Sequence, residues 1–318
     1  MRLLVTGGAG YIGSVVAVHL LDAGHEVTVV DDLSTGHADA VPAGAQFVQT
    51  GIDAVGPLLA GGGFDGVLHF AAKSLVGESV EHPERYWRGN IVATLALLDA
   101  IRDAGVPRMV FSSTAATYGE PTQVPITETA PTAPTNPYGA SKLAIDMMLA
   151  AESAAHGLGA VSLRYFNVAG AVGRQGERHA TETHLIPIAL QVAAGQRESL
   201  TIYGEDYPTP DGTCIRDYIH VDDLARAHLL ALESAKPGRH RIYNLGNGAG
   251  FSVRQVVEAV RTATGHPIPV TSGARRAGDP ATLIASSARI RDELGWAPNR
   301  PSVEEMAADA WHYLQESG

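Results

Sequence analysis

A tyrosine and a lysine, Tyr138 and Lys142, stand four positions apart in the run from Asn136 to Lys142. On a helix, two side chains at this spacing share one face, so the ammonium group can lie beside the phenol. A neighbouring positive charge favours the ionised phenol and lowers its pKa from the ordinary value of about 10. The pair therefore predicts a tyrosine that acts as a base. The same spacing also occurs by chance on half-exposed helices, and the pair by itself does not separate the two interpretations.

A glycine loop follows the first predicted strand and opens the first predicted helix, with glycines at Gly7, Gly10 and Gly13. Such a loop allows a tight turn and a close approach of backbone to a pyrophosphate at a helix N-terminus. Asp31 stands at the end of the second predicted strand, where a carboxylate can accept hydrogen bonds from the adenosine ribose. Because a carboxylate there repels a 2′-phosphate, the loop predicts NAD rather than NADP. The alternative is a glycine turn without a ligand.

Short apolar runs alternate with helical patterns along the first half of the chain, which is typical of a parallel sheet with crossover helices. Strands are predicted over 2–6, 26–30, 46–49, 66–70, 108–112 and 160–164. Helices are predicted to begin near residues 11, 53, 83 and 138. The helix over 83–104 is predicted to bury Ile91, Leu95, Leu98 and Ile101 on one face. The predicted fold is therefore α/β, a Rossmann-type doubly wound parallel sheet.

After about Gly170 the alternation gives way to longer loops rich in glycine, proline and aspartate, such as 204–212. Helices are still predicted over 221–233, 253–264 and 302–315, with a strand over 241–245. We therefore expect a dinucleotide-binding domain over 1–170 and a smaller mixed α/β domain over 171–318, with some segments returning to the first domain.

The composition excludes several classes of function. A net charge of −11 and the absence of a Lys/Arg run argue against a nucleic-acid partner. The apolar runs are too short to span a bilayer, and no secretory leader is recognised, so no membrane partner is predicted. With Cys214 as its single cysteine the chain forms no internal disulfide, and a cytoplasmic location is expected. Its 13 histidines lack Cys-x-x-Cys or His-Glu-x-x-His spacing, so no metal site is predicted.

Several further segments occur in a fixed order along nearly the whole chain. They are His69-Phe70-Ala71-Ala72, Val76-Gly77-Glu78-Ser79, Ser112-Ser113-Thr114, Arg164-Tyr165-Phe166-Asn167, Asp211-Gly212-Thr213, Arg216 to Val221 and Tyr243-Asn244-Leu245-Gly246. Together with the glycine loop and the Tyr138–Lys142 pair, they resemble the extended short-chain dehydrogenase/reductase family, and within it the UDP-glucose 4-epimerase group. The resemblance implies a Rossmann domain that holds NAD and a second domain that holds a UDP-sugar.

The resemblance also implies roles for individual residues. Thr114, Tyr138 and Lys142 match the catalytic positions, which also contact NAD, and the first two contact the sugar as well. Cofactor-binding positions are matched by Gly7, Gly10, Tyr11, Ile12, Gly13, Asp31, Asp32, Leu33, Ser34, Thr35, Gly36, Ile52, Phe70, Ala71, Ala72, Lys73, Ser74, Asn90 and Phe166. Substrate-binding positions are matched by Asn167, His184, Leu185, Tyr203, Arg216, Arg276, Asp279 and Leu283. The two arginines are expected on the diphosphate, the alternative being ordinary surface ion pairs.

Three positions depart from the family pattern. Gly51 stands where many members carry an aspartate near the adenine, and Gly89 where some carry an asparagine, the nearest amide being Asn90. Ser74 replaces a lysine of some members, although Lys73 is adjacent. Each departure puts one cofactor contact in doubt.

The resemblance implies a reaction at carbon 4 of the sugar. Ionised Tyr138 takes the proton of the 4-hydroxyl while hydride passes to NAD, and the bound 4-ketose turns over so that hydride returns to the opposite face. Lys142 holds the phenolate and the nicotinamide ribose, Thr114 bonds the same region, and Phe166 lies beside the nicotinamide. The expected activity is interconversion of UDP-glucose and UDP-galactose by a homodimer.

Two alternatives belong to other classes of function. A nucleotide-sugar 4,6-dehydratase needs an acid and a base after the strand-end threonine, but Ala115 and Ala116 can transfer no proton. A non-catalytic NAD-binding scaffold is disfavoured because Tyr138 and Lys142 are both present. Another NAD-dependent nucleotide-sugar epimerase also remains open.

Two finer expectations concern substrate breadth and assembly. Leu283 occupies a position where the family varies between tyrosine and smaller residues, so UDP-N-acetylglucosamine and its 4-epimer are possible further substrates, unless Leu283 only packs in the core. A homodimer is expected through the helices beginning near Pro83 and Tyr138, to which Ile145, Met148 and Leu149 could contribute unless they face the sheet.

Overall fold

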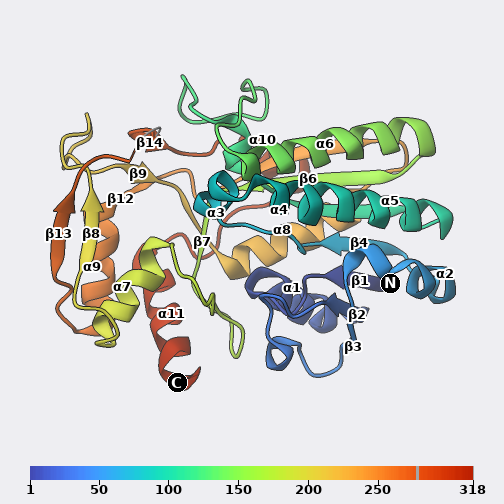
Figure 1. Ribbon diagram of the computed structural model, residues 1–318, viewed down its shortest axis with the longest axis horizontal. Helices are drawn as coiled ribbons and strands as arrows, with labels where there is room; N and C mark the ends of the chain where they lie inside the picture. The colour runs from blue at the N-terminus through green and yellow to red at the C-terminus, as the bar shows by residue number, and fades with distance from the viewer. Residues whose placement is uncertain (277–278, 318) are drawn as a thin grey trace.

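The structure, a computed structural model, describes residues 1–276 and 279–317. Its centre is a seven-stranded parallel sheet in the order β11-β6-β5-β4-β1-β2-β3 (Figure 1). The bounds of these strands are Arg2–Thr6 (β1), Glu26–Asp31 (β2), Gln46–Gln49 (β3), Gly66–His69 (β4), Arg108–Thr114 (β5), Gly159–Tyr165 (β6) and His240–Leu245 (β11). The predicted α/β fold with a doubly wound parallel sheet is confirmed.

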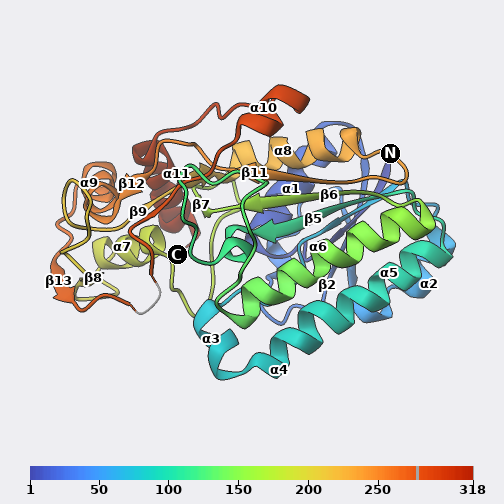
Figure 2. The same cartoon turned by 90° about the horizontal axis from the view of Figure 1, so that it is seen from above.

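Helices cover both faces of the sheet (Figure 2). One face packs against α1 (Tyr11–Asp22), α8 (Val221–Ser234) and α10 (Ala288–Leu294). The other packs against α2 (Gly56–Gly62), α5 (Ala93–Asp103) and α6 (Pro137–His156). Because both faces are buried, the strands are apolar along most of their length, as in Leu3, Leu4 and Val5 of β1.

The chain after Gly170 contributes to two parts of the molecule. The strand β11 pairs with β6 and so extends the central sheet. The helices α8 and α10 pack on one face of that sheet. Three helices form a separate apolar cluster at one end of the molecule (left in Figure 1), namely α7 (Leu185–Ala193), α9 (Val253–Thr264) and α11 (Val303–Ser317). The helix α7 was not among the predicted elements. Residues 277, 278 and 318 of the predicted second domain lie outside the described residues.

Short strands complete this second part. The strands β8 (Leu200–Tyr203) and β13 (Val270–Gly273) pair in parallel, and β7 (Asn167–Ala169) pairs with β10 (Tyr218–His220). The remaining three form one small sheet in the order β12-β9-β14, with bounds Phe251–Ser252, Ile215–Arg216 and Thr282–Leu283. This sheet brings the segments 215–216 and 282–283 side by side.

The prediction of one continuous helix over 83–104 is wrong in detail. A short α4 (Pro83–Tyr86) follows α3 (Val76–Glu81) and continues as a π-helical segment, η3 (Trp87–Val92), before α5 begins. A π-helical turn takes up an extra residue and therefore shifts the face that later residues present. Within α5 the buried face consists of Thr94, Leu97, Leu98 and Ile101. Leu95 lies off this face and is 48% exposed, so the prediction that it is buried is wrong. No helix in the described part of the chain is long and apolar enough to cross a membrane.

Candidate active site

The sequence-predicted site residues gather at the carboxyl edge of the sheet. Parallel strands all end at this edge, and the chain order reverses beside β1, where doubly wound folds bind their ligands. Gly7 follows β1, Asp31 ends β2, Phe70 follows β4, Thr114 ends β5 and Phe166 follows β6. The topology therefore brings groups that are far apart in sequence to one edge.

The glycine loop has the shape that a pyrophosphate requires. Gly7 has a φ of +72°, and a Cβ there would lie 2.5 Å from the backbone nitrogen of Ala71. A Cβ on Gly13 would lie 2.3 Å from the carbonyl oxygen of Gly7. No side chain caps the N-terminus of α1 at Gly10, and no acidic residue lies in its first turn. These features leave the positive end of the helix dipole open to an anionic group, so the loop fits a dinucleotide.

Asp31 is fixed where it can receive the adenosine ribose. Its Oδ2 accepts a hydrogen bond from the backbone N–H of Ala9 (3.0 Å), and its Oδ1 accepts one from Leu33 (2.9 Å). Burial raises the pKa of this carboxyl, while the two backbone hydrogen bonds act in the opposite direction. A carboxylate has about four lone-pair sites, so Asp31 retains acceptors for hydroxyl groups. The backbone of Leu33 takes a left-handed φ of 60°. This bend directs the segment 32–36 over the carboxyl edge of the sheet.

The structure gives a physical account of the glycine at position 51. An ideal Cβ on Gly51 would lie 2.5 Å from the Oδ1 atom of Asp53, so the Asp53 carboxylate occupies the space beside Gly51. Both residues lie at the short helix η2 (Ile52–Ala54), which follows β3 and contains the buried Ile52. A carboxylate is therefore present beside position 51 although it comes from another residue.

Asn90, a predicted cofactor-binding residue, is held by hydrogen bonds to neighbouring elements of the chain. It is completely buried, and its Oδ1 accepts from the backbone N–H of Lys73 (2.8 Å). Its Nδ2 donates to the carbonyl oxygen of Lys73 (3.0 Å) and to the Oγ of Ser141 (2.9 Å). The side-chain carbons of Lys73 cover Gly89, with Cε 3.4 Å from where a Cβ would stand. In this structure Asn90 thus positions the Lys73 backbone against α6, while Ser74 is exposed.

The start of α6 places Tyr138 beside Thr114. The Asn136 side chain caps the helix by accepting from the backbone N–H of Gly139 (2.8 Å), and Pro137 occupies the first turn. A Cβ on Gly139 would lie 2.5 Å from the carbonyl oxygen of Ala116, so glycine lets the helix approach the end of β5. Burial raises the pKa of Tyr138, and a hydrogen bond with the Thr114 side chain lowers it. The predicted pair of hydroxyl groups is therefore assembled.

Lys142 lies close to Tyr138 but bonds elsewhere. Its Nζ donates to the carbonyl oxygen of Ser112 (2.8 Å) and lies 6.0 Å from the centre of the Tyr138 ring. Burial lowers the pKa of Lys142 to about 7, and Asp146 opposes that shift. The prediction that Lys142 lowers the pKa of Tyr138 is wrong for this state of the molecule, because burial outweighs any effect of the distant amine.

The predicted sugar-site residues make three contacts with one another in the second part of the chain. Arg216 donates to the carboxylate of Asp279 and, through Nη1, to the carbonyl oxygen of Ile215 (2.7 Å). Leu283 pairs with Arg216 in the register of β14 and β9. The Arg276 guanidinium lies 4.1 Å from the centre of the exposed Tyr203 ring.

The other predicted sugar-site residues are placed as follows. Asn167 uses its Nδ2 to donate to the carbonyl oxygen of Asp217 (2.8 Å). His184 and Leu185 lie at the start of α7, where His184 is the N-cap residue.

Residues 3–246 match the profile of the NAD dependent epimerase/dehydratase family. The chain belongs to this family.

Relatives in the family match essentially the whole chain. The UDP-glucose 4-epimerase of Corynebacterium glutamicum is 59% identical over an alignment that covers 100% of this chain and 97% of that protein. The enzyme of the same name from Streptomyces lividans is 60% identical, with 98% and 95% covered. The structure of UDP-glucose 4-epimerase from Bifidobacterium longum in complex with NAD+ and UDP superposes with a TM-score of 0.93 at 36% identity, covering 99% and 98%. The predicted resemblance to the UDP-glucose 4-epimerase group is confirmed.

One supporting group of this family member was missed in the sequence. Asp146 lies one helical turn after Lys142 on α6 and is buried. Its Oδ2 accepts from Arg164 through Nε (3.0 Å) and Nη2 (2.8 Å), and from the Ser113 hydroxyl (3.2 Å). Removing one partner of a buried ion pair leaves an uncompensated charge, so this arrangement fixes α6 against β5 and β6. The sequence offers one indication of this role. Asp146 stands four residues after Lys142, on the helix face that also buries Ile145 and Leu149.

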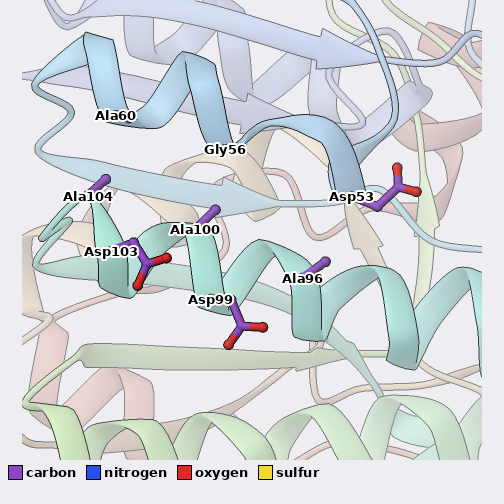
Figure 3. Close-up of a pocket in the computed structure, with 8 residues that line it drawn as sticks. All are labelled: Asp53, Gly56, Ala60, Ala96, Asp99, Ala100, Asp103 and Ala104. Atoms are coloured by element: carbon purple, nitrogen blue, oxygen red, sulfur yellow. The ribbon is translucent and has the colours of Figure 1, made fainter.

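A groove between α2 and α5 lies apart from Thr114 and Tyr138. Figure 3 shows it lined by alanines and by the carboxylates of Asp53, Asp99 and Asp103. Neither Thr114 nor Tyr138 belongs to it, and it supplies no group that could exchange a proton with a sugar hydroxyl at the end of β5.

Proposed function

We propose that this protein interconverts UDP-glucose and UDP-galactose by inverting carbon 4 of the sugar, with NAD as a retained cofactor. The observation that carries the proposal is the meeting of Thr114, Tyr138 and Lys142 at the end of β5, next to a glycine loop shaped for a dinucleotide. The similarity over the whole chain, at 59% and 60% identity, to the UDP-glucose 4-epimerases of Corynebacterium glutamicum and Streptomyces lividans supports the same choice of substrate.

In this proposal each catalytic residue has a separate task. Bound NAD supplies a hydride acceptor at carbon 4 and, in its oxidised form, a positive ring charge. Tyr138 accepts the proton of the 4-hydroxyl and later returns it, so one residue serves as base and acid. Thr114 orients the phenol, in keeping with its hydrogen bond to Tyr138. Lys142, once drawn from the Ser112 carbonyl oxygen toward the ligands, stabilises the phenolate.

The pKa of the Tyr138 phenol supports these assigned tasks. Burial raises the pKa of Tyr138 when no ligand charge is present, so its proton is held. Positive charge that arrives with the oxidised cofactor lowers the pKa of the phenol. The base is then generated only when the site is loaded, which protects the sugar site from unproductive proton exchange.

The proposed sugar-binding residues come from the second part of the chain. We assign the diphosphate to Arg216 and Arg276, because a planar guanidinium suits phosphate oxygens. Asp279 holds Arg216 in place, and Tyr203 stacks on Arg276. The other proposed contacts are Asn167, His184, Leu185 and Leu283. With the hexose anchored through its diphosphate, the 4-ketose can rotate and present its opposite face.

Cofactor contacts are proposed for the loop and strand-end residues predicted above, with two refinements. Asp53 takes the place of an aspartate at position 51 near the adenine, since its carboxylate already covers Gly51. Asn90 acts by holding the backbone of Lys73 rather than by direct contact.

Dehydration remains disfavoured as an alternative reaction. It requires proton-transferring groups next to Thr114, and the short helix η4 (Ala115–Tyr118) offers the methyl groups of Ala115 and Ala116 there. A scaffold role remains possible only if the purified protein does not turn over UDP-sugars.

We also propose the domain division at about residue 170, a homodimer and a cytoplasmic location. Exposed apolar side chains on the helices at 83–103 and on α6 support the dimer, with Trp87, Val92, Leu95 and Met147 all accessible. The helices α5 and α6 lie side by side (Figure 2), so a second copy could pack on both.

The experiment that tests the function is an assay of the purified protein with UDP-galactose. We expect UDP-glucose to form without added cofactor if NAD is retained. A transient near-ultraviolet absorbance of NADH should appear on adding UDP-sugar, because the hydride passes through the bound cofactor. A protein that binds NAD but neither converts UDP-galactose nor develops this absorbance would support the scaffold alternative.

A further inference from the structure

A segment before α7 carries two histidines and two glutamates that converge on one point. Glu177, His179, Glu182 and His184 each offer one ligand atom, and these four atoms all lie within 4.8 Å of one another. In sequence they form a repeated Glu-x-His pattern, which neither of the metal motifs considered above would detect. Among the described residues this is the one group that combines imidazole and carboxylate ligands in this way.

The contacts within the group are already those of ligands facing a common centre. The Nδ1 of His184 lies 2.7 Å from the Oε1 of Glu182, and the Nδ1 of His179 faces the Oε1 of Glu177 in the same way. The two imidazole rings are nearly parallel, with centres 5.9 Å apart. Each ring therefore presents a nitrogen to a carboxylate, and the two pairs are adjacent.

The segment is held in place by its neighbours and does not depend on the four groups alone. Arg178 donates to both carboxylate oxygens of Asp39 (2.9 Å each), and its carbonyl oxygen lies 3.1 Å from the Nε2 of His37. A Cβ on Gly176 would lie 2.3 Å from the Tyr313 ring of α11. The cluster thus lies on a fixed connection between the loop after β2 and the helices of the second part.

We propose that Glu177, His179, Glu182 and His184 bind one divalent first-row metal ion of the zinc type. His184 would use the Nδ1 atom that faces Glu182, which leaves its Nε2 for the sugar contact proposed above. Neutral imidazole nitrogens and carboxylate oxygens are ligands that Zn²⁺ takes at about 2.0–2.2 Å, which places neighbouring ligands of a tetrahedral ion about 3.4 Å apart. Atoms already within 4.8 Å of one another reach that spacing through small side-chain rotations.

A bound cation would also change the electrostatics around Glu182 and Tyr11. Glu182 is only 8% exposed, and the nearby Tyr11 phenol has its pKa raised by burial and by the charges of Glu177 and Glu182. Without metal, each carboxylate is paired with an imidazole, Glu177 with His179 and Glu182 with His184. A divalent cation held by the same four groups would add positive charge close to the Tyr11 phenol.

The test uses the NAD-loaded full-length protein, freed of metal by dialysis against a chelator and then titrated with ZnCl2 by equilibrium dialysis with metal analysis. We expect one saturable Zn²⁺ per chain and a rise in the thermal unfolding temperature on binding. The isosteric variant Glu177→Gln and the variant His179→Ala should each weaken binding by about tenfold or more, since even outer ligands cost 10–100-fold.

A control variant separates this site from adventitious binding by surface histidines. His312 and Glu316 form an exposed His–Glu pair with nitrogen and oxygen 3.2 Å apart. His312→Ala should leave the affinity and the stoichiometry unchanged. Cobalt(II) provides a second measurement, because a tetrahedral site gives visible absorption that both cluster variants should lose. If the wild-type protein shows no saturable site, or if Glu177→Gln and His179→Ala bind like the wild type, the four residues are two Glu–His ion pairs and the proposal is wrong.

Discussion

At the scale of single residues, Tyr138 is the group whose removal should separate chemistry from binding. Tyr138→Phe deletes one hydroxyl and keeps the ring that packs edge-on against Tyr86, with ring centres 6.4 Å apart. Because general acid–base catalysis contributes about 10²–10⁴-fold, we expect turnover of UDP-galactose to fall by that factor with little change in NAD binding. Steady-state kinetics and a cofactor titration measure the two quantities.

A matched change elsewhere controls for the loss of a buried hydroxyl. Tyr243 of β11 donates to the Oε2 of Glu293 (2.8 Å) on the far side of the sheet. Tyr243→Phe should cost about 0.5–1.5 kcal/mol of stability and leave turnover near that of the wild type. Equal losses of turnover in the two variants would remove Tyr138 from the mechanism.

Lys142 should leave a signature in the pH dependence of stability. Burial lowers its pKa to about 7 in the folded protein, whereas in the unfolded chain it is about 10.4. Between these two values the unfolded chain binds a proton that the folded protein does not, so stability rises with pH in this window. The loss of unfolding free energy that comes from burying the protonated amine is fully present below about pH 7 and disappears above about pH 10.4.

Lys142→Met removes this proton difference and should also abolish turnover. Relative to the variant, the wild type should gain about 2 kcal/mol of unfolding free energy between about pH 7.5 and about pH 9.5. Urea unfolding of both cofactor-free proteins at the two pH values measures the gain. Parallel pH profiles would mean that the amine titrates at its ordinary pKa when folded.

Leu283 should control which sugars are accepted. It is half-buried on β14, directly across from Arg216, and so lies beside the proposed diphosphate site. Leu283→Tyr adds a ring that competes for space with an N-acetyl group, so turnover of the N-acetylated sugar relative to the plain one should fall about tenfold or more. Leu283→Met, which nearly conserves volume, should keep the ratio. A ratio unaltered by tyrosine would mean that Leu283 only packs in the interior.

At the scale of elements, the approach of α6 to the end of β5 should depend on Gly139. An added Cβ would lie 2.5 Å from the carbonyl oxygen of Ala116, so Gly139→Ala must push the helix start away from Thr114. A displacement of about 1 Å in a reacting group costs about 10²-fold in rate, and we expect kcat to fall by that order.

Gly61→Ala is the appropriate control for this substitution. Gly61 lies on α2 with no atom within 4 Å of where its Cβ would stand. Alanine is the better helix former by about 1 kcal/mol, so this change should preserve or raise stability and keep kcat. Wild-type kinetics of Gly139→Ala would show that the helix can shift without disturbing Tyr138.

The same elements show what the sequence could predict and what it could not. The first six strands were predicted from apolar runs, because strands buried on both faces of a parallel sheet are apolar throughout. The π-helical segment η3 was not predictable from periodicity. It coincides with Asn90, whose amide is held by Lys73 and Ser141, contacts made by residues distant in sequence. Leu95 was predicted to be buried but is 48% exposed, because the buried face of α5 contains Leu97, Leu98 and Ile101 instead.

At the scale of the whole molecule, long-range pairing was the main limit of prediction. A strand over 241–245 was expected, but its parallel pairing with β6 was not, because nothing in the local sequence specifies a partner. The cofactor loop and the Tyr138–Lys142 pair were predictable, since each lies within a few residues. Asp146 with Arg164, and the four residues of the Glu-x-His segment, were not, since their roles emerge only when separate elements pack together.

The proposed homodimer should depend on the exposed apolar side chains of α5 and α6. Leu95 on α5 and Met147 on α6 are 48% and 67% exposed, and a stable interface buries apolar side chains of this kind at its centre. Replacing both with glutamate places unpaired charges there, and because central interface residues contribute about 2 kcal/mol or more each, dissociation should become at least about 100-fold easier. Light scattering during size-exclusion chromatography should then find a monomer, whereas Val270→Glu on β13, where Val270 is 40% exposed, should remain dimeric. Tyr138 lies on the same helix as Met147, so a loss of turnover that accompanies dissociation would show that the geometry of α6 depends on the dimer. If the protein with both glutamates is still a dimer, the interface lies on another face.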